Sequence, residues 1–561
     1  MLCRCLPRKG LVALSAALLA FVSHGARVVY DWDVTYVTVN RDGYNTRRAI
    51  GVNNELPIPP IEATIGDTLV LNVHNSLDVP TSVHSHGLFH RGTNYLDGAT
   101  MVTQCGIPPG ESFTYEYVVR QTGTFWMHGH NLHQNSDGLR TPLIIHDDGD
   151  APFEYDEEFH FSFEDWYPSE FAARIKVTLD PNGPFPPSPT FPYALINGYN
   201  GNDTKPIRFK PGRTYRIRVV NMSTTEWFKF SLPGHKLRVI EADGIYSEPL
   251  EVDGLDLSPG QRYSALVTAY DSDEYNYNYK VTLYADFVPN NAGMSPRYYQ
   301  GLVEYSKDAP LKDVVVDETA MVYAKDIELS ALDHEPELPV DRSIALSIGN
   351  NPYSNGLHLD HINNITYAQP LIPSLYTALT MGDLATNEEV YGPQTHAIVL
   401  NHNEVVELVI SNPNDLPHPL HLHGHAFQIT EYGPVSTPIP PKFGNPPVVM
   451  YSGAPMKRDT MSIPEYQYIK VRFKADNPGV WLLHCHMDIH FAMGMVLTFI
   501  EAPDVLQETQ KPTQLQLDHC AMQGIKTSGN AAGNQGLDLT GLPTPPTVVG
   551  RNTPPPSTGR S

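Results

Sequence analysis

Positive charge, cysteine and long apolar runs are all scarce in this sequence of 561 residues. The chain has 38 basic and 62 acidic residues, a net charge of −24. This balance argues against nucleic acid or anionic lipid as a partner, because phosphate groups bind clustered Lys and Arg. Beyond the N-terminus no stretch reaches the ~18 apolar residues of a membrane span, and the C-terminus lacks the hydrophobic tail of a lipid-anchor signal. We therefore expect no transmembrane anchor.

The N-terminus has the features of a secretory signal peptide over residues 1–25. Arg4, Arg8 and Lys9 form a basic segment ahead of the apolar run 11–22, and a small residue precedes the expected cleavage before Ala26. The sequence thus predicts a secreted protein, extracellular or in the cell wall. Glycosylation signals of the Asn-x-Ser/Thr type, which fit this route, occur at Asn202, Asn221 and Asn364.

Short runs with strand-like alternation recur along the chain, separated by turn residues. Examples are residues 67–73, 215–220 and 405–410, and the chain holds 50 prolines and 41 glycines. This pattern is typical of all-β sandwiches or barrels. The length suggests about three domains.

Two distant segments of the chain repeat each other. Residues 67–87 align without a gap with residues 404–424, and residues 123–130 match residues 479–486. A third copy begins at Pro211 but lacks a His-x-His pair. We place three domains at residues 26–150, 151–310 and 335–505, with metal ligands in the first and third. The remaining residues 506–561 are rich in Pro and Gly, and we predict a poorly ordered tail there.

Four His-x-His pairs occupy the repeated positions. Residues i and i+2 of a strand point to the same face, so one strand can offer two imidazoles to a metal site. A single pair would be unremarkable on a surface strand, but four repeated pairs indicate ligands, and eight imidazoles are too many for one ion. The pairs are His84/His86, His128/His130, His421/His423 and His484/His486.

The segment around the last pair combines the donors of a blue-copper site. Cys485 lies within that pair, His490 and Met495 follow it, and His418 lies upstream. Such sites bind copper through a thiolate, two imidazoles and a weak axial thioether. We therefore expect His418, Cys485 and His490 as strong ligands and Met495 as the axial one. Because Cys485 is covalently joined to two cluster histidines, an electron has a short through-bond route to the cluster.

The motifs His418-Pro-Leu-His-Leu-His-Gly-His and His484-Cys-His-x-x-x-His resemble the signature of the three-domain multicopper oxidases. This superfamily includes laccases, ascorbate oxidase and fungal ferroxidases. The similarity runs over roughly residues 30–505, and segments such as His86-Gly-Leu-Phe and Arg458-Asp-Thr look closest to the fungal iron-oxidase-like and pigment-laccase-like branch.

The resemblance implies three consecutive cupredoxin-like Greek-key domains and four copper ions. It assigns His84 and His421 to a type 2 copper, and His418, Cys485 and His490, with Met495, to a type 1 copper. It assigns the other six to a type 3 pair: His86, His128, His130, His423, His484 and His486. Three further histidines, His90, His133 and His425, are not carried over, and we expect them beside the ligands or on the surface.

Reduction of O2 to water consumes protons, so carboxylates are expected near the cluster. Asp97 and Asp488 stand where similar enzymes keep such acids; the alternatives are a turn residue for Asp97 and a solvated acid for Asp488. Of the three cysteines after the signal peptide, Cys485 must remain a thiolate, which leaves Cys105 and Cys520 to form a disulfide or two free thiols. Similar oxidases link domain 1 to the C-terminal segment in this way, and we predict the disulfide.

The reducing substrate is not determined by these motifs. The resembling ferroxidases bind ferrous ion through carboxylates near the type 1 copper, and the candidates here are Asp165, Asp415 and Asp286. Asn414 holds the aligned position beside Asp415, so the acid set is incomplete. The membrane segment by which ferroxidases of iron uptake hold a permease is also missing.

We therefore predict a monomeric, laccase-like oxidase that couples one-electron oxidation of phenols or aromatic pigment precursors to reduction of O2. Ferroxidase activity, with Fe(II) as the substrate, is the alternative. A copper-binding protein without catalysis is a third interpretation, but it would leave the link between Cys485 and the cluster without a purpose.

Overall fold

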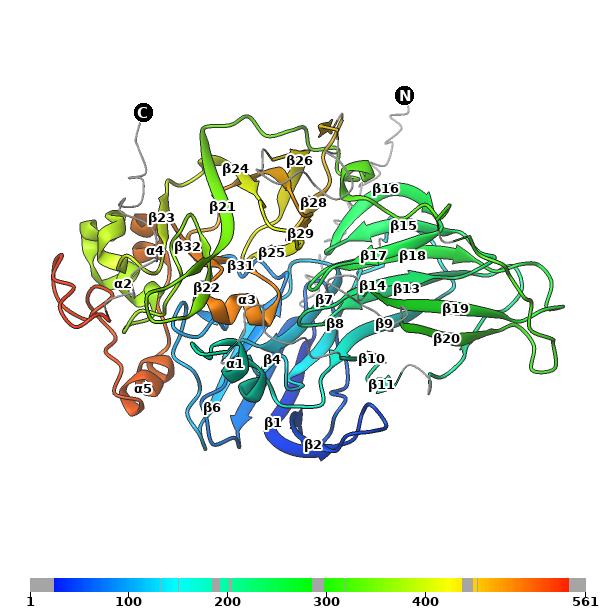
Figure 1. The fold of residues 1–561 in the computed structure, drawn as a ribbon, viewed down its shortest axis with the longest axis horizontal. Helices are drawn as coiled ribbons and strands as arrows, with labels where there is room; N and C mark the ends of the chain where they lie inside the picture. Colours follow the sequence, from blue (N-terminus) through cyan, green and yellow to red (C-terminus); the bar gives the residue numbers. More distant parts are fainter. Residues whose placement is uncertain are drawn as a thin grey trace, which may run out of the picture.

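The computed structural model describes residues 25–543, except for 132, 150, 184–191, 201–203, 285–296, 318, 436–446 and 452. The chain forms three β-sandwiches, and the prediction of an all-β protein of three domains is confirmed. In Figure 1 the first domain (blue) lies below the third (yellow to orange), and the second (green) extends to the right. Among the described residues no helix is long and apolar enough to cross a membrane.

The first domain is a sandwich of two four-stranded sheets, ordered β2-β1-β4-β6 and β3-β8-β7-β5. Strand β6 shows why these residues fold in this way: Phe113, Tyr115 and Tyr117 alternate with exposed residues, so one face is buried in the core. The elements are β1 (Arg27–Val39), β2 (Arg47–Val52), β3 (Ile61–Thr64), β4 (Thr68–Asn75), β5 (Val83–His86), η1 (Asn94–Leu96), β6 (Ser112–Val118), β7 (Gly123–Gly129) and β8 (Arg140–His146).

The second domain has sheets ordered β11-β10-β9-β13-β18-β15-β16 and β12-β20-β19-β14-β17. Its elements are β9 (Glu157–Trp166), α1 (Phe171–Thr178), β10 (Tyr193–Ile196), β11 (Tyr199–Asn200), β12 (Ile207–Arg208), β13 (Thr214–Asn221), β14 (Trp227–Ser231), β15 (Leu237–Ala242), β16 (Ile245–Val252), β17 (Gly254–Leu257), β18 (Arg262–Thr268), β19 (Tyr277–Tyr284), β20 (Arg297–Glu304) and η2 (Asp326–Glu328).

The third domain has sheets ordered β22-β21-β24-β30-β26-β27, with β28 beside β26, and β23-β32-β31-β25-β29. Its elements are β21 (Arg342–Pro352), β22 (His358–Ile362), α2 (Ser374–Thr380), η3 (Gly382–Thr386), η4 (Glu388–Tyr391), β23 (Ala397–Leu400), β24 (Val405–Ser411), β25 (His418–Leu422), β26 (Phe427–Pro434), β27 (Val449–Met450), β28 (Lys457–Arg458), β29 (Thr460–Ile463), β30 (Gln467–Lys474), β31 (Gly479–Cys485), α3 (Asp488–Met493) and β32 (Val496–Glu501).

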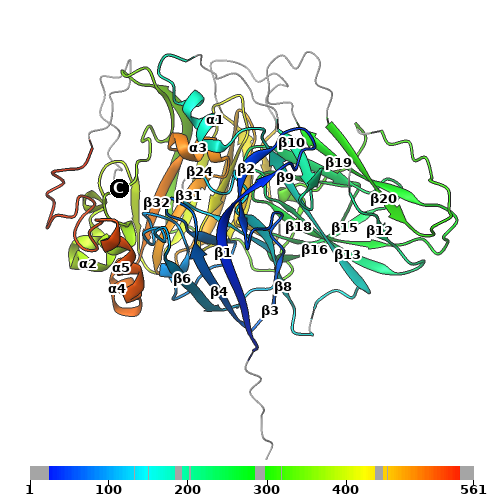
Figure 2. The ribbon, with the colours of Figure 1, turned by 90° about the horizontal axis from the view of Figure 1, so that it is seen from below.

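The repeat in the sequence has a counterpart in strand pairing. In each domain the first strand runs parallel to the strand that carries the repeated segment: β1 with β4, β9 with β13, and β21 with β24. In Figure 2, seen from below, the first domain lies in front of the junction of the other two. The three copies therefore have the same parallel pairing of strands, although only two of them carry histidine pairs.

The prediction of a poorly ordered tail is wrong for residues 506–543. Helices α4 (Pro503–Thr509) and α5 (Gln514–Met522) follow the last strand, and Thr513 and Gln516 form a capping box on α5. The Gln516 amide donates to Tyr95 O at 2.5 Å, and Gln523 donates to Gly106 O at 2.8 Å. Polar composition suggested disorder, but the first domain supplies acceptors for these side chains. Residues 544–561 lie outside the described part.

The structure contradicts the prediction of one glycosylation site. Asn221 is fully buried at the end of β13, and its amide donates to Glu226 O at 2.9 Å and Leu257 O at 3.0 Å. A glycan has no room there, so the prediction at Asn221 is wrong. Asn364 lies in a half-buried turn, and Asn202 lies outside the described residues.

The predicted disulfide between Cys105 and Cys520 is present and joins residues 415 positions apart. It ties the first domain to α5, and both cysteines are buried. We expect Cys520→Ser to lower the free energy of unfolding by about 2–4 kcal/mol, because the unfolded chain then loses a constraint on a very long loop. Denaturation by urea, followed by tryptophan fluorescence, measures this change. Cys105→Ser should have the same effect and the double variant no more; stability equal to the parent would contradict the prediction.

Candidate metal centre

The four His-x-His pairs lie at two pairs of neighbouring strands. Three of the histidines, His130, His423 and His486, directly follow the last residue of their strand. In the first domain β5 pairs antiparallel with β7, which sets His84 opposite His128. In the third domain β25 pairs antiparallel with β31, which sets His421 opposite His484. Because alternate residues of a strand share a face, each strand pair presents its imidazoles on one side.

These two faces meet between the first and third domains. The ring of His84 stacks on that of His423 with centroids 4.0 Å apart, and His86 stacks on His421 at 3.7 Å. We call the eight imidazoles together the histidine cluster: His84, His86, His128, His130, His421, His423, His484 and His486. All are buried except His130, which is half-buried.

Several ring nitrogens of the histidine cluster face one another with nothing else to bind. His423 Nε2 lies 3.1 Å from His484 Nε2, and His86 Nδ1 lies 3.2 Å from His486 Nε2. The Nε2 atoms of His84, His128 and His421 are buried and have no hydrogen-bond partner. Donor atoms grouped within 4.8 Å of one another come from His84/His86/His128, from His84/His421/His423 and from His130/His423/His484. Orphaned nitrogens grouped in this way fit metal ions better than hydrogen bonds.

The protonation of the histidine cluster suits metal binding. Burial, together with the charge of neighbouring imidazoles, holds the pKa of His86, His128, His423, His484 and His486 well below the usual value. The same causes lower the pKa of His130 to about 3. Neutral imidazoles are the form that binds copper, so the donor set fits the predicted metal.

The second predicted site, which we call the cysteine site, comprises His418, Cys485 and His490. The Cys485 Sγ lies 3.5 Å from His490 Nδ1 and 3.8 Å from His418 Nδ1, and the two Nδ1 atoms are 3.1 Å apart. Burial raises the pKa of the Cys485 thiol, so a bound cation is needed to hold it as a thiolate at neutral pH. The structure therefore brings together two imidazoles and one sulfur, which are blue-copper ligands.

Strand alternation on β31 separates the two sites while keeping them adjacent. Cys485 points into the apolar core of the third domain, where Met495 is also fully buried, whereas His484 faces the histidine cluster. The Cys485 N–H donates to Met495 O at 3.0 Å, which holds the start of β32 against the cysteine. The predicted axial residue is thus part of the layer around the cysteine site.

Asp97 contacts the cluster from the loop after η1. Its Oδ2 lies 3.0 Å from His423 Nδ1, and its backbone oxygen accepts a hydrogen bond from His84 Nδ1 at 2.7 Å. Burial raises the pKa of Asp97, but His423 and His84 outweigh this and hold it well below the usual value. The next residue must be glycine, because a Cβ at Gly98 would lie 1.9 Å from Val83 O. This close approach presses Asp97 against β5.

Asp488 begins α3 two residues after His486. Its Oδ2 accepts a hydrogen bond from Ser136 Oγ at 2.5 Å, and its N–H donates to Thr224 O at 3.0 Å. Burial raises its pKa to about 7, despite the opposing hydrogen bonds of Ser136 and Asn135. The two predicted acids therefore differ: the pKa of Asp97 lies well below the usual value, whereas that of Asp488 is raised to about 7.

A third acid at the cluster, Asp459, was not predicted. It is fully buried, its Oδ1 lies 3.2 Å from His86 Nε2, and its backbone oxygen accepts from His421 Nδ1 at 2.9 Å. Both carboxylate oxygens accept from Arg262 of the second domain, at 2.7 and 2.6 Å. The Arg458-Asp-Thr segment was noted only as a resemblance, because nothing local in the sequence shows which imidazole an acid will contact.

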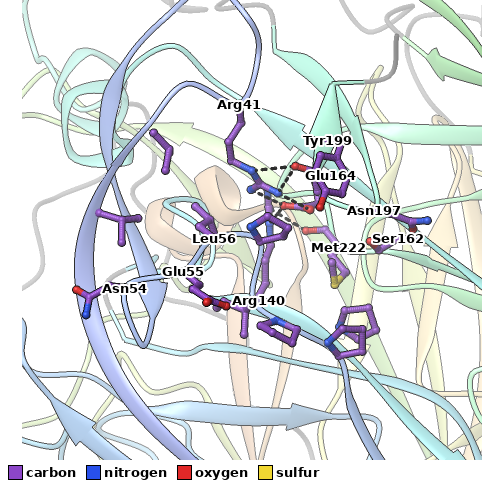
Figure 3. Close-up of a pocket in the computed structure, with 18 of the residues that line it drawn as sticks. Arg41, Asn54, Glu55, Leu56, Arg140, Ser162, Glu164, Asn197, Tyr199 and Met222 are labelled. Carbon is purple, nitrogen blue, oxygen red and sulfur yellow. Dashed lines mark hydrogen bonds and ion pairs between the residues drawn. The ribbon is translucent and has the colours of Figure 1, made fainter. Parts of the chain in front are cut away.

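A second group of buried charges surrounds Arg140 on β8, the strand next to β7. Arg140 lies opposite His128, and its Nε is 3.0 Å from Glu164 Oε2. Arg41 also pairs with Glu164 through two hydrogen bonds of 3.0 Å, as Figure 3 shows. These residues line a cavity of about 1010 Å³ between the first two domains. Because Arg41 and Arg140 both pair with Glu164, these charges hold the first and second domains together. They leave no unpaired charge among the three to bind a ligand.

The three predicted iron-binding acids do not form a set. Asp165 is fully buried, accepts from Thr224 N–H at 2.9 Å and faces Arg140, so the structure does not support it as an iron ligand. Asp415 is exposed in the loop before β25, and Asp286 lies outside the described residues. Asn414, not an acid, contacts the cysteine site: its Nδ2 lies 3.3 Å from His418 Nε2.

The three histidines not assigned to copper lie beside the ligands. His425 is buried, with its Nε2 2.9 Å from Glu501 Oε2. His90 is buried, and neither ring nitrogen has a hydrogen-bond partner. His133 is half-buried, and its ring is tilted against that of Phe171 with centroids 4.4 Å apart. They therefore belong to the surroundings of the cluster.

The buried pair of Arg262 and Asp459 yields a stability prediction. Arg262→Ala leaves the Asp459 carboxylate buried without its cationic partner, and we expect the free energy of unfolding to fall by about 3–5 kcal/mol. Urea denaturation measures the loss. Arg208→Ala is the control, since Arg208 pairs with Glu304 on the surface at 75% exposure and should change stability by about 1 kcal/mol or less. Equal effects of the two variants would contradict the role of Arg262.

Comparison with known proteins agrees with this centre. Family models described as multicopper oxidase match residues 33–150, 157–299 and 367–505. The iron transport multicopper oxidase fetC of Epichloe festucae is 38% identical over 550 residues, which cover 96% of this chain and 87% of that protein. The iron multicopper oxidase fer1 of Mycosarcoma maydis is 37% identical over 581 residues, 97% of this chain and 91% of that protein.

Two solved structures extend the comparison. The crystal structure of Fet3p, a multicopper oxidase that functions in iron import, has a TM-score of 0.83 at 32% identity and covers 92% of this chain and 98% of its own. The laccase from Botrytis aclada has a TM-score of 0.71 at 27% identity, over 89% of this chain and 92% of its own. The three matched segments and these relatives show that the chain belongs to the multicopper oxidase family, copper-dependent oxidoreductases that use O2 as the electron acceptor.

Proposed function

We propose that this protein oxidises ferrous iron one electron at a time at the cysteine site and reduces O2 to water at the histidine cluster. The observation that carries the proposal is the similarity, over more than nine tenths of the chain, to proteins named as iron multicopper oxidases. The laccase structure is less similar in both sequence and fold. This comparison favours the ferroxidase alternative over the phenol oxidase predicted first from the sequence.

The proposed copper complement is four ions. His418, Cys485 and His490, with Met495 beside them, would hold a type 1 copper, and His84 and His421 a type 2 copper. The type 3 pair would be held by the other six histidines of the cluster: His86, His128, His130, His423, His484 and His486. The bound copper supplies one-electron transfer and a place for O2 to be reduced.

The chain itself provides the connection between the two sites. Cys485 is bonded through the backbone to one cluster histidine on each side, and its carbonyl accepts a hydrogen bond from His484 Nδ1 at 2.9 Å. This hydrogen bond adds a second short route beside the covalent one. We propose that electrons from the substrate pass along this segment of β31.

Asp97 and Asp488 have different parts in the proposed reaction. Asp97 orients His84 and His423 through hydrogen bonds and keeps a negative charge at the cluster. Asp488, held by Ser136, is placed to hold and deliver protons for water formation. Both assignments are supported by burial and contacts of the carboxylates.

Secretion is part of the same proposal. The predicted signal peptide and the disulfide between Cys105 and Cys520 fit an oxidising compartment. An extracellular oxidase would meet its reducing substrate outside the cell.

Phenol oxidation is the second candidate function, and Asn414 is the observation that favours it. A neutral amide, not a carboxylate, contacts the Nε2 of His418, and Asp165 is buried away from solvent. A phenol needs no anionic ligand, whereas a carboxylate is a recurrent ligand of Fe(II) in proteins. Steady-state oxygen consumption with ferrous iron and with a panel of phenols distinguishes the two. Saturable iron turnover with poor phenol turnover supports the proposal; the reverse result would reject it.

Asn414→Asp tests whether the side chain next to His418 affects which substrate the protein oxidises. We expect kcat/KM for ferrous iron to rise about tenfold, equivalent to about 1.4 kcal/mol, because a carboxylate beside His418 attracts the cation. For a neutral phenol the change should stay within about threefold. Asn403→Asp, which adds the same charge on an exposed turn of the third domain, is the control. Equal changes for both substrates, or equal changes in both variants, would contradict the prediction.

The cysteine site is tested by Cys485→Ser. We expect the parent to be blue from charge transfer between thiolate and copper, and the variant to lose this absorption and the oxidase activity, because serine offers no sulfur. Copper bound by the cluster histidines should remain. Absorption and paramagnetic resonance spectra, with copper counted by elemental analysis, check the outcome; a variant that stayed blue would refute the assignment of Cys485.

A further inference from the structure

Asp360 is a buried carboxylate near the cysteine site that the proposed copper assignments do not use. It lies on β22, opposite Asn350 of β21, and is 5% exposed. Asn350 Nδ2 donates to its Oδ1 at 2.8 Å, while Oδ2 is buried and has no hydrogen-bond partner. A buried carboxylate oxygen without a donor is energetically costly. The position therefore calls for a donor group on its open side.

The surrounding backbone holds Asp360 in place relative to α3, the helix that carries His490. Strand β22 packs against α3. The Tyr367 N–H donates to Gly494 O at 3.0 Å, and Thr366 Oγ1 donates to Asp360 O at 2.8 Å. Gly494 has φ +102°, and a Cβ there would lie 2.5 Å from Thr366 Cγ2. Thus the segment from Asp360 to Tyr367 packs closely against the end of α3.

His490 is the complementary group. Its Nδ1 faces Cys485 Sγ and His418 Nδ1, so its Nε2 is turned away from the metal position. Burial lowers the pKa of His490, and the charge of Asp360 opposes that change; burial raises the pKa of Asp360, and His490 opposes it in turn. The two side chains are therefore close enough for each to shift the pKa of the other.

We propose that Asp360 is the positioning residue of His490: with copper on Nδ1, the Nε2–H of His490 donates a hydrogen bond to the open Oδ2 of Asp360. Metal-bound histidines generally donate their second N–H to a carboxylate or carbonyl, which fixes the ring and increases its basicity. A buried negative charge at this point also favours the oxidised, more positive form of the site and so lowers its reduction potential. The inference rests on the type 1 assignment of the proposed function.

The test compares Asp360→Asn with the parent and with Asp383→Asn. Asparagine keeps the size of the side chain and can still accept from Asn350, but it removes the charge. Asp383 is an exposed acid of the same domain, so its variant removes the same charge where solvent screens it. The measurement is the reduction potential of the copper at the cysteine site, from redox titration of its blue absorption. Paramagnetic resonance of the same samples reports the ligand field.

Asp360→Asn should shift the redox equilibrium at least tenfold toward the reduced form, a rise of about 59 mV for one electron, and change the resonance spectrum. Asp383→Asn should leave both unchanged. A crystal structure of the copper-loaded parent should place Asp360 Oδ2 within about 3.2 Å of His490 Nε2. A potential equal to that of Asp383→Asn, or a distance beyond hydrogen bonding, would overturn the proposal.

A second variant covers the case in which Asp360→Asn fails to fold or to bind copper. Asn350→Ala removes the amide that holds Oδ1 and leaves the charge in place, so it should shift the potential by a smaller amount and broaden the resonance lines as His490 loosens. Unchanged potential and lines in Asn350→Ala would then count against the proposal. A parent that is not blue would instead defeat the type 1 assignment itself, while a blue parent with an unshifted Asp360→Asn would defeat only the role of Asp360.

Discussion

The stacking of imidazoles across the boundary between the first and third domains is the constraint on which the rest of this structure depends. His84 on His423 and His86 on His421 pair one domain with the other, and the Nε2 atoms of His84 and His421 are buried without a hydrogen-bond partner. Neither domain can complete the cluster alone. The disulfide, helix α5 and Asn94, whose side chain exchanges two hydrogen bonds with Val480 of β31, all hold this same boundary closed.

The second domain contributes charge rather than ligands. Arg262 neutralises Asp459, which in turn contacts His86, and Asp243 accepts two hydrogen bonds from Arg458 at 2.8 Å. Removing ionised groups from water is expensive unless each is paired. The alternation of acids and arginines from two domains meets that condition, and it explains why a domain without histidine pairs packs tightly against the cluster.

In the proposed function, the cysteine site takes part in both electron transfer and the choice of substrate. Cys485 is enclosed by the apolar core of the third domain, but His490 remains partly exposed and His418 is reached by Asn414. Sequence similarity favours iron as the substrate, while the amide at Asn414 departs from the acidic edge expected of a ferroxidase. Asp360 offers a carboxylate from within the third domain, on the side of His490, so negative charge near this site does not depend on the loop before β25.

The sequence by itself determined the all-β fold and the candidate metal ligands that occupy the repeated positions. Alternation along a strand is a local property, so His-x-His pairs and the placement of Cys485 between two of them could be interpreted without a structure. What only the tertiary structure decided depends on how three domains meet. Packing makes Asp459 a neighbour of His86, sets Asp360 near His490, buries Asp165 and Asn221, and gives the polar residues after 505 partners in the first domain. Burial and ion pairing bring together residues hundreds of positions apart, and no local sequence pattern predicts these contacts.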